Sequence, residues 1–138
     1  MAAGQRPTLQ ASSLQAASSQ SNGLDVLTAV GGWVFLDVSA VSGTGTPQMS
    51  AWLQGWDGVG WFDLFHNGAG PTADATQADQ TAAAAGKRNI NGASVITAAG
   101  KYSAFYPQLP TKIRLRWNIT GTFTSVQGFT FSATADVK

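Results

Sequence analysis

Lys112 to Thr120 reads Lys-Ile-Arg-Leu-Arg-Trp-Asn-Ile-Thr, and this stretch decides the fold class. Large apolar side chains occupy every second position, and polar or cationic side chains occupy the positions between them. Because successive side chains of a β-strand point to opposite faces, this period of two predicts a strand with one face in an apolar core. The opposite face would then carry three cations, Lys112, Arg114 and Arg116.

Other alternating segments extend this pattern over most of the chain. They predict strands at residues 24–27, 33–41, 48–56, 61–65, 93–97, 101–106, 112–120 and 128–135. Asp57-Gly58 lies between two of these strands and is typical of a hairpin turn, whereas the two glycines and the proline of 42–47 predict a loop. About eight strands without a convincing amphipathic helix predict an all-β protein, an antiparallel β-sandwich resembling a jelly roll.

Composition divides the chain into an N-terminal arm and one β-sandwich domain. Residues 1–22 are rich in Ala, Ser and Gln, and their contact candidates are Arg6, Leu9 and Leu14. Such a segment is expected to be flexible, either without a role or as an arm that orders when a partner holds it. Residues 23–138 form the domain, in which 67–91 is expected to be a long loop, solvated or functional, with helix-forming composition at 76–85.

The composition also argues against several classes of function. Only 11% of residues are charged, the net charge is +1, and Cys and Glu are absent, so no nucleic-acid partner, disulfide or thiolate metal site is expected. The N-terminus lacks the apolar run of a signal peptide, and no apolar stretch is long enough to cross a membrane, which predicts a soluble protein made in a cytoplasm. With His66 as the only histidine and Asp57 and Asp63 assigned to turn and surface positions, no catalytic residue, metal site or cofactor is predicted.

Aromatic residues remain on faces that the predicted core does not use. Trp52 and Trp56 share a strand face with glutamines, and this face is open to three interpretations: a sugar platform, a second core face, or a surface buried between subunits, which we favour. The segment 33–41 carries bulky side chains on both faces near its start, which predicts a central strand or one covered by a loop or a neighbouring subunit. Arg114 and Arg116 are expected on a solvated face or at a salt-bridging interface.

An ordered series of segments resembles a family of small virion proteins of tailed bacteriophages. It spans about residues 24–135 and reads Trp33-Val-Phe-Leu-Asp-Val-Ser-Ala-Val-Ser-Gly-Thr44, Leu53-Gln-Gly-Trp-Asp57, Trp61-Phe-Asp-Leu64, Ile96-Thr-Ala-Ala-Gly-Lys-Tyr102, Tyr106-Pro-Gln-Leu-Pro110, Ile113-Arg-Leu-Arg-Trp-Asn-Ile-Thr-Gly-Thr122 and Phe129-Thr-Phe-Ser-Ala133. The loop 67–91 is longer than this pattern implies, and the tryptophan content is higher.

Members of that family resemble capsid decoration or cement proteins. The resemblance implies a non-enzymatic protein on the capsid exterior of a virion, bound to the major capsid protein, often as a homotrimer at local threefold positions, where it braces the shell. The candidate capsid or subunit contacts are Arg6, Leu9, Leu14, Trp52, Trp56, Arg114 and Arg116. The alternative is a carbohydrate-binding or tail-associated receptor-binding module.

Overall fold

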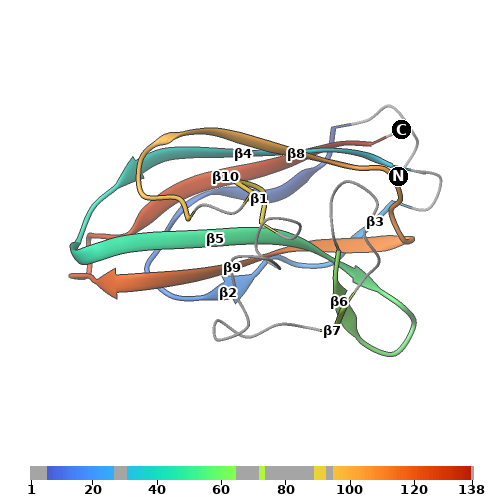
Figure 1. Cartoon of the computed structure of the whole chain (residues 1–138), viewed down its shortest axis with the longest axis horizontal. Coiled ribbons are helices and arrows are strands. Elements are labelled where there is room, and N and C mark those ends of the chain that lie inside the picture. Colours follow the sequence, from blue (N-terminus) through green and yellow to red (C-terminus); the bar gives the residue numbers. More distant parts are fainter. Residues whose placement is uncertain (1–5, 27–30, 65–71, 74–88, 93–94, 138) are drawn as a thin grey trace.

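The protein is described by a computed structural model that covers residues 6–26, 31–64, 72–73, 89–92 and 95–137. The regular elements of this part of the chain are β-strands in two antiparallel sheets that face each other (Figure 1), which confirms the predicted all-β sandwich. Sheet A has the order β1 (Thr8–Gln15), β10 (Phe129–Val137), β4 (Gly32–Val41), β8 (Gly100–Tyr106). Sheet B has the order β2 (Ser19–Gln20), β9 (Lys112–Thr122), β5 (Thr44–Trp56), β6 (Trp61–Asp63), β7 (Thr72–Ala73), and β3 (Leu24–Asp25) also pairs with β9.

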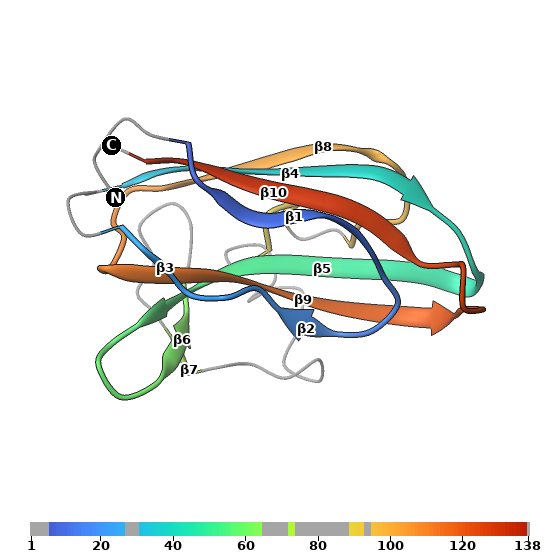
Figure 2. The ribbon, with the colours of Figure 1, turned by 180° about the vertical axis from the view of Figure 1, so that it is seen from behind.

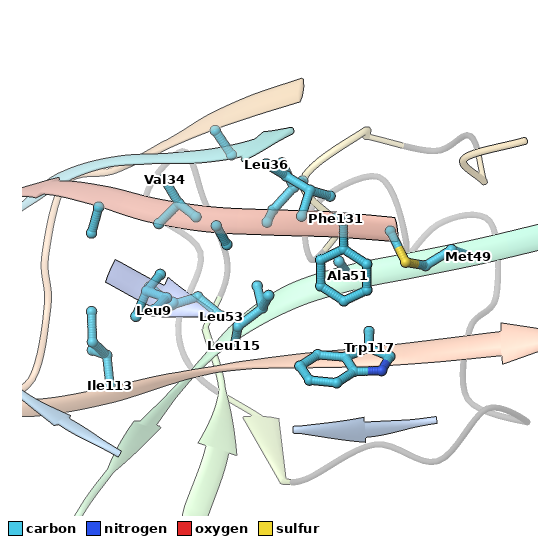
Figure 3. Packing of buried hydrophobic residues seen from close by; sticks show 14 of the residues in the cluster. Leu9, Val34, Leu36, Met49, Ala51, Leu53, Ile113, Leu115, Trp117 and Phe131 are labelled. Atoms are coloured by element: carbon cyan, nitrogen blue, oxygen red, sulfur yellow. The ribbon is translucent and has the colours of Figure 1, made fainter. Parts of the chain in front are cut away.

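The core lies between the two sheets and follows the predicted alternation. In β9 the side chains of Ile113, Leu115 and Trp117 are buried, as are the alternate residues of β10 that face them from sheet A. Figure 3 shows Trp117 below Phe131, and their ring centroids lie 5.1 Å apart at an interplanar angle of 79°. This edge-to-face contact joins the centres of the two sheets.

The predicted hairpin at Asp57 is confirmed. Trp56 pairs with Trp61, and Gly58 adopts a φ of 102°, which a side chain would make unfavourable. The Asp57 carboxylate accepts hydrogen bonds from the backbone N–H groups of Gly60 and Val59, both at 2.8 Å. These two donors lower the pKa of Asp57, so the turn is favoured when this carboxylate is charged.

The N-terminal segment belongs to the sandwich, so the predicted flexible arm is wrong for residues 8–22. β1 pairs with β10 at the edge of sheet A, and the chain then crosses to sheet B, where β2 pairs with β9 (Figure 2). Two serine hydroxyls accept hydrogen bonds from backbone N–H groups at the edge of β9. Leu115 N–H donates to Ser21 Oγ at 2.9 Å, and Ile119 N–H donates to Ser18 Oγ at 3.0 Å. Edge pairing uses backbone groups that every residue carries, so a segment without apolar bulk can still be ordered.

Two other segments differ from the prediction. β5 begins at Thr44 and passes through Pro47, although 42–47 was expected to be a loop, and a register shift between Thr44 and Gln48 accommodates this start. The expected strand 93–97 is reduced, among its described residues, to a bridge between Ile96 and Met49. The possible helix at 76–85 and most of the loop 67–91 lie outside the described residues.

Leucine substitutions in β1 test whether the N-terminal segment is part of the fold. Leu9 is buried in the core, so Leu9→Ala should lower the free energy of unfolding by about 2–3 kcal/mol in urea denaturation. Leu14 lies on the same strand but is 43% exposed, so Leu14→Ala is the matched control, with an expected loss below about 0.5 kcal/mol. Equal stability of the two variants would show that β1 does not hold this position in solution.

Candidate interaction surface

Three aromatic side chains lie together on the outer face of sheet A. They are Trp33 and Phe35 of β4 and Phe105 of β8, and we call them the aromatic cluster. Their neighbours Val34 and Leu36 point into the core, so strand alternation turns the aromatic residues outward. Each of the three remains 40–41% exposed, which is high for side chains of this size.

The rings of the aromatic cluster contact one another. Trp33 and Phe105 are directly opposite on paired strands, with ring centroids 5.3 Å apart at 49°. Phe35 follows two residues along β4, and its ring lies 6.3 Å from that of Trp33 at 18°, so these two rings are almost parallel. The cluster is therefore one continuous apolar patch.

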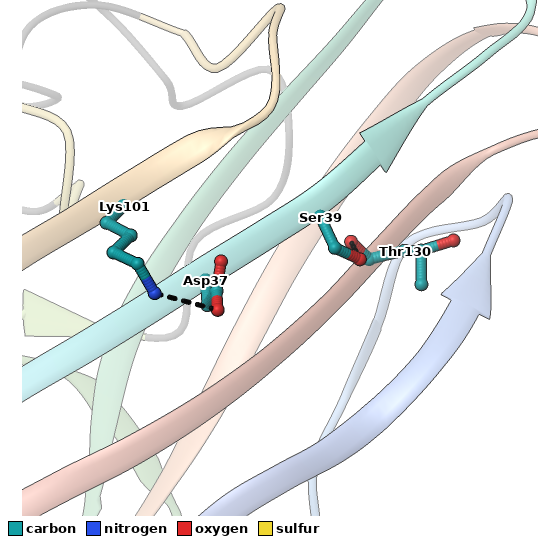
Figure 4. A network of polar contacts seen from close by, with 4 residues as sticks. All are labelled: Asp37, Ser39, Lys101 and Thr130. Carbon is teal, nitrogen blue, oxygen red and sulfur yellow. Dashed lines mark hydrogen bonds and ion pairs between the residues drawn. The ribbon is translucent and has the colours of Figure 1, made fainter.

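Two ion pairs frame this patch, so the charged side chains that the structure describes at its rim are neutralised in pairs. Lys101 Nζ lies 3.1 Å from Asp37 Oδ2 at one end, beside the contact in which Ser39 Oγ donates to the Thr130 carbonyl (Figure 4). At the other end, Arg6 lies 3.4 Å from Asp136, the cross-strand neighbour of Trp33. An apolar patch with neutralised charges at its rim is typical of a surface that binds an uncharged region of a partner.

The outer face of sheet B is closed instead by buried polar contacts. Asp63 Oδ1 accepts hydrogen bonds from Trp52 Nε1 and from Gln54 Nε2, both at 2.8 Å, and all three side chains are fully buried. Arg114 Nε donates to Gln54 Oε1 at 2.7 Å, and its guanidinium lies 4.2 Å from the centre of the Trp61 ring. Trp52 thus has its donor satisfied inside the chain, which a buried indole requires.

This network also affects the phenol of Tyr106, which is fully buried on the core side. Burial raises the pKa of Tyr106, and the negative charge of Asp63 raises it further, while the polar backbone of Leu53 opposes the shift. The phenol therefore stays protonated across the physiological range. Asp63 is the one carboxylate on which both the indole of Trp52 and the amide of Gln54 depend.

The structure divides the predicted contact residues between the two sheets. Arg6 and Leu14 lie on the outer face of sheet A, whereas Leu9 is in the core. The predicted sheet B residues are Trp52, Trp56, Arg114 and Arg116, of which only Trp52 is fully buried. Trp52 is buried within its own chain on a second face of β5. The favoured interpretation, burial between subunits, is therefore wrong for this residue. Its ring also offers no surface on which a sugar could stack.

Sequence reasoning recognised the bulk of Trp33 and Phe35 but missed Phe105. The signal for Phe105 was present in the alternation of 101–106. This alternation places the Phe105 side chain on one face of the strand and those of Ala104 and Tyr106 on the other face. What the sequence does not contain is the pairing of β8 with β4, which brings Phe105 beside Trp33.

In the described part of the chain, no three His, Cys, Asp or Glu residues gather in a way that would hold a metal ion, and no helix is long and apolar enough to cross a membrane. His66 lies outside it. No protein-family model, curated protein sequence or solved structure matches the chain.

Removal of the Asp63 carboxylate tests the buried network. Asp63→Ala leaves the Trp52 and Gln54 donors buried without this acceptor, so the free energy of unfolding should fall by about 2–4 kcal/mol. Asp63→Asn keeps an oxygen at the same place and should lose less. Urea titrations followed by tryptophan fluorescence would measure both, and a parental stability of Asp63→Ala would contradict the role assigned to the carboxylate.

Proposed function

We propose that this chain is a non-enzymatic structural protein of a phage virion that binds the outer surface of the capsid and stabilises the shell. The observation that carries the proposal is the aromatic cluster, an exposed apolar patch with a neutral rim on one face of a sandwich. Exposed patches of contacting aromatic residues are characteristic of protein-binding surfaces, and Trp is enriched among the residues that dominate binding energy. The phage resemblance of the sequence supplies the proposed partner, the major capsid protein.

The architecture suits a bracing role. The cluster is carried by β4 and β8, two paired strands of the sandwich, so its rings are held by a backbone that hydrogen bonds and core packing keep in place. A rigid contact surface loses little conformational entropy when it binds. In a homotrimer, which the resemblance implies, three such surfaces would act together, and effective concentration would raise the overall affinity without new contacts.

A second candidate function is carbohydrate or receptor binding, and one observation favours it. The rings of Trp33 and Phe35 are almost parallel and partly exposed, and sugar rings stack on exposed aromatic rings. This candidate site replaces the predicted platform at Trp52 and Trp56, because Trp52 is buried. The neutral rim and the tilted ring of Phe105 fit a protein surface as well, so the two functions must be separated by experiment.

Binding to expanded, undecorated phage capsids tests the proposal. Trp33→Ser should weaken binding at least about tenfold in co-sedimentation, because it removes the ring that contacts both other members of the cluster. Val59→Ser is the matched control: Val59 is an 88% exposed apolar residue in the β5–β6 hairpin of the other sheet and should leave binding unchanged.

Two outcomes would contradict the capsid proposal. Equal capsid occupancy by the parent and Trp33→Ser, imaged by cryo-electron microscopy, would remove the aromatic cluster as the docking surface. Empty capsids together with glycan-array binding that Trp33→Ser abolishes would establish the carbohydrate alternative instead.

A further inference from the structure

Residues 6–21 lie across the edges of both sheets as one segment. β1 forms the outermost strand of sheet A against β10, and β2 lies on the β9 edge of sheet B. Between them, the Ala17 carbonyl accepts a hydrogen bond from Trp117 Nε1 at 3.1 Å. Figure 2 shows this segment in blue, with β1 beside β10 in one sheet and β2 beside β9 in the other.

Few side chains of this segment are buried, and strand pairing attaches it to both sheets. Within 6–21 only Leu9 and Ser21 are buried, and Leu14, the other large apolar residue, is exposed. The large buried side chains of the core come from strands outside the segment, chiefly β4, β5, β9 and β10. Detachment of residues 6–21 would therefore uncover little apolar surface compared with detachment of any central strand.

The register of β1 is also weakly specified. Eight residues of β1, Thr8–Gln15, lie opposite six residues of β10, and the pairing shifts twice along the way. Leu9 is the one side chain of β1 in the core, so a slip of this strand displaces a single apolar residue. Strands whose register is so weakly specified are prone to alternate pairing and domain swapping. The edges that β1 and β2 cover would accept the same segment equally well from another chain, since the hydrogen bonds would be identical.

We propose that residues 6–21 form an exchange segment, which one copy of this chain supplies to the β10 and β9 edges of another copy. Asn22 and Gly23, both exposed, join the segment to β3 and are the place where the chain would turn toward the neighbour. Reciprocal exchange gives a dimer, and exchange around a closed ring gives a trimer. The inference does not rest on capsid binding, because it concerns only contacts between copies of the chain.

Engineered cysteines test the exchange, and because the chain has no native cysteine, only the introduced cysteines can form a disulfide. Leu14 and Thr130 are cross-strand partners on the outer face of sheet A, so Leu14→Cys and Thr130→Cys can form a disulfide only where β1 meets β10. The two full-length single variants, one of them size-tagged, are mixed in urea, refolded together at high concentration and oxidised with oxidised glutathione. Exchange predicts a disulfide-linked heterodimer of the two chains.

Two controls make the outcome decisive. Thr134→Cys replaces Thr130→Cys in the control mixture, since position 134 lies four residues along β10, about 13 Å away and out of disulfide reach. The test mixture should give several-fold more heterodimer than this control. The double variant Leu14→Cys/Thr130→Cys shows whether the pair is competent to form the bond: an internal disulfide in that variant, with no excess heterodimer in the test mixture, would overturn the proposal.

Discussion

The structure depends on the face-to-face packing of two sheets whose inner faces are apolar. No disulfide reinforces it, because the chain has no cysteine, so burial between the sheets must supply most of the cohesion. The centre of this packing is the edge-to-face contact of Trp117 with Phe131, from the strands β9 and β10 that dominate the two inner faces. β9 in turn pairs with β5 along nearly its whole length, so these two strands form the centre of sheet B.

Sequence periodicity predicted the elements that carry this core and failed where periodicity carries no information. The alternation in 112–120 and 128–135 is a local property, and it gave the inward residues of β9 and β10 correctly. β1 was missed because its pairing uses backbone groups and buries only Leu9, which leaves no apolar pattern to read. The face of Trp52 was predicted, and a second core face was one of the three interpretations left open for it. The choice between them could not be made, because a period of two tells which side chains share a face and not what covers that face.

The two outer faces of the sandwich differ in how their polar groups are satisfied, and this difference favours sheet A as the contact surface. On sheet B, the donors of Trp52 and Gln54 and the guanidinium of Arg114 are engaged within the chain, so a partner would have to break existing hydrogen bonds to use them. On sheet A, the rings of the aromatic cluster are exposed, and the contacts described for them are with one another. Covering them removes apolar surface from water and disturbs no hydrogen bond of the sandwich.

The exchange segment and the aromatic cluster meet at one residue. Arg6 begins the segment, and its ion pair with Asp136 forms the rim of the cluster beside Trp33. If the segment comes from a neighbouring copy, the guanidinium at this rim comes from that neighbour as well, and the neutral frame around the rings is complete only in the assembly. A lone chain whose β1 has detached would instead leave Asp136 as an uncompensated negative charge next to the apolar patch. Self-association and partner binding would then be coupled through this single ion pair, and an uncharged partner surface would favour the assembled form.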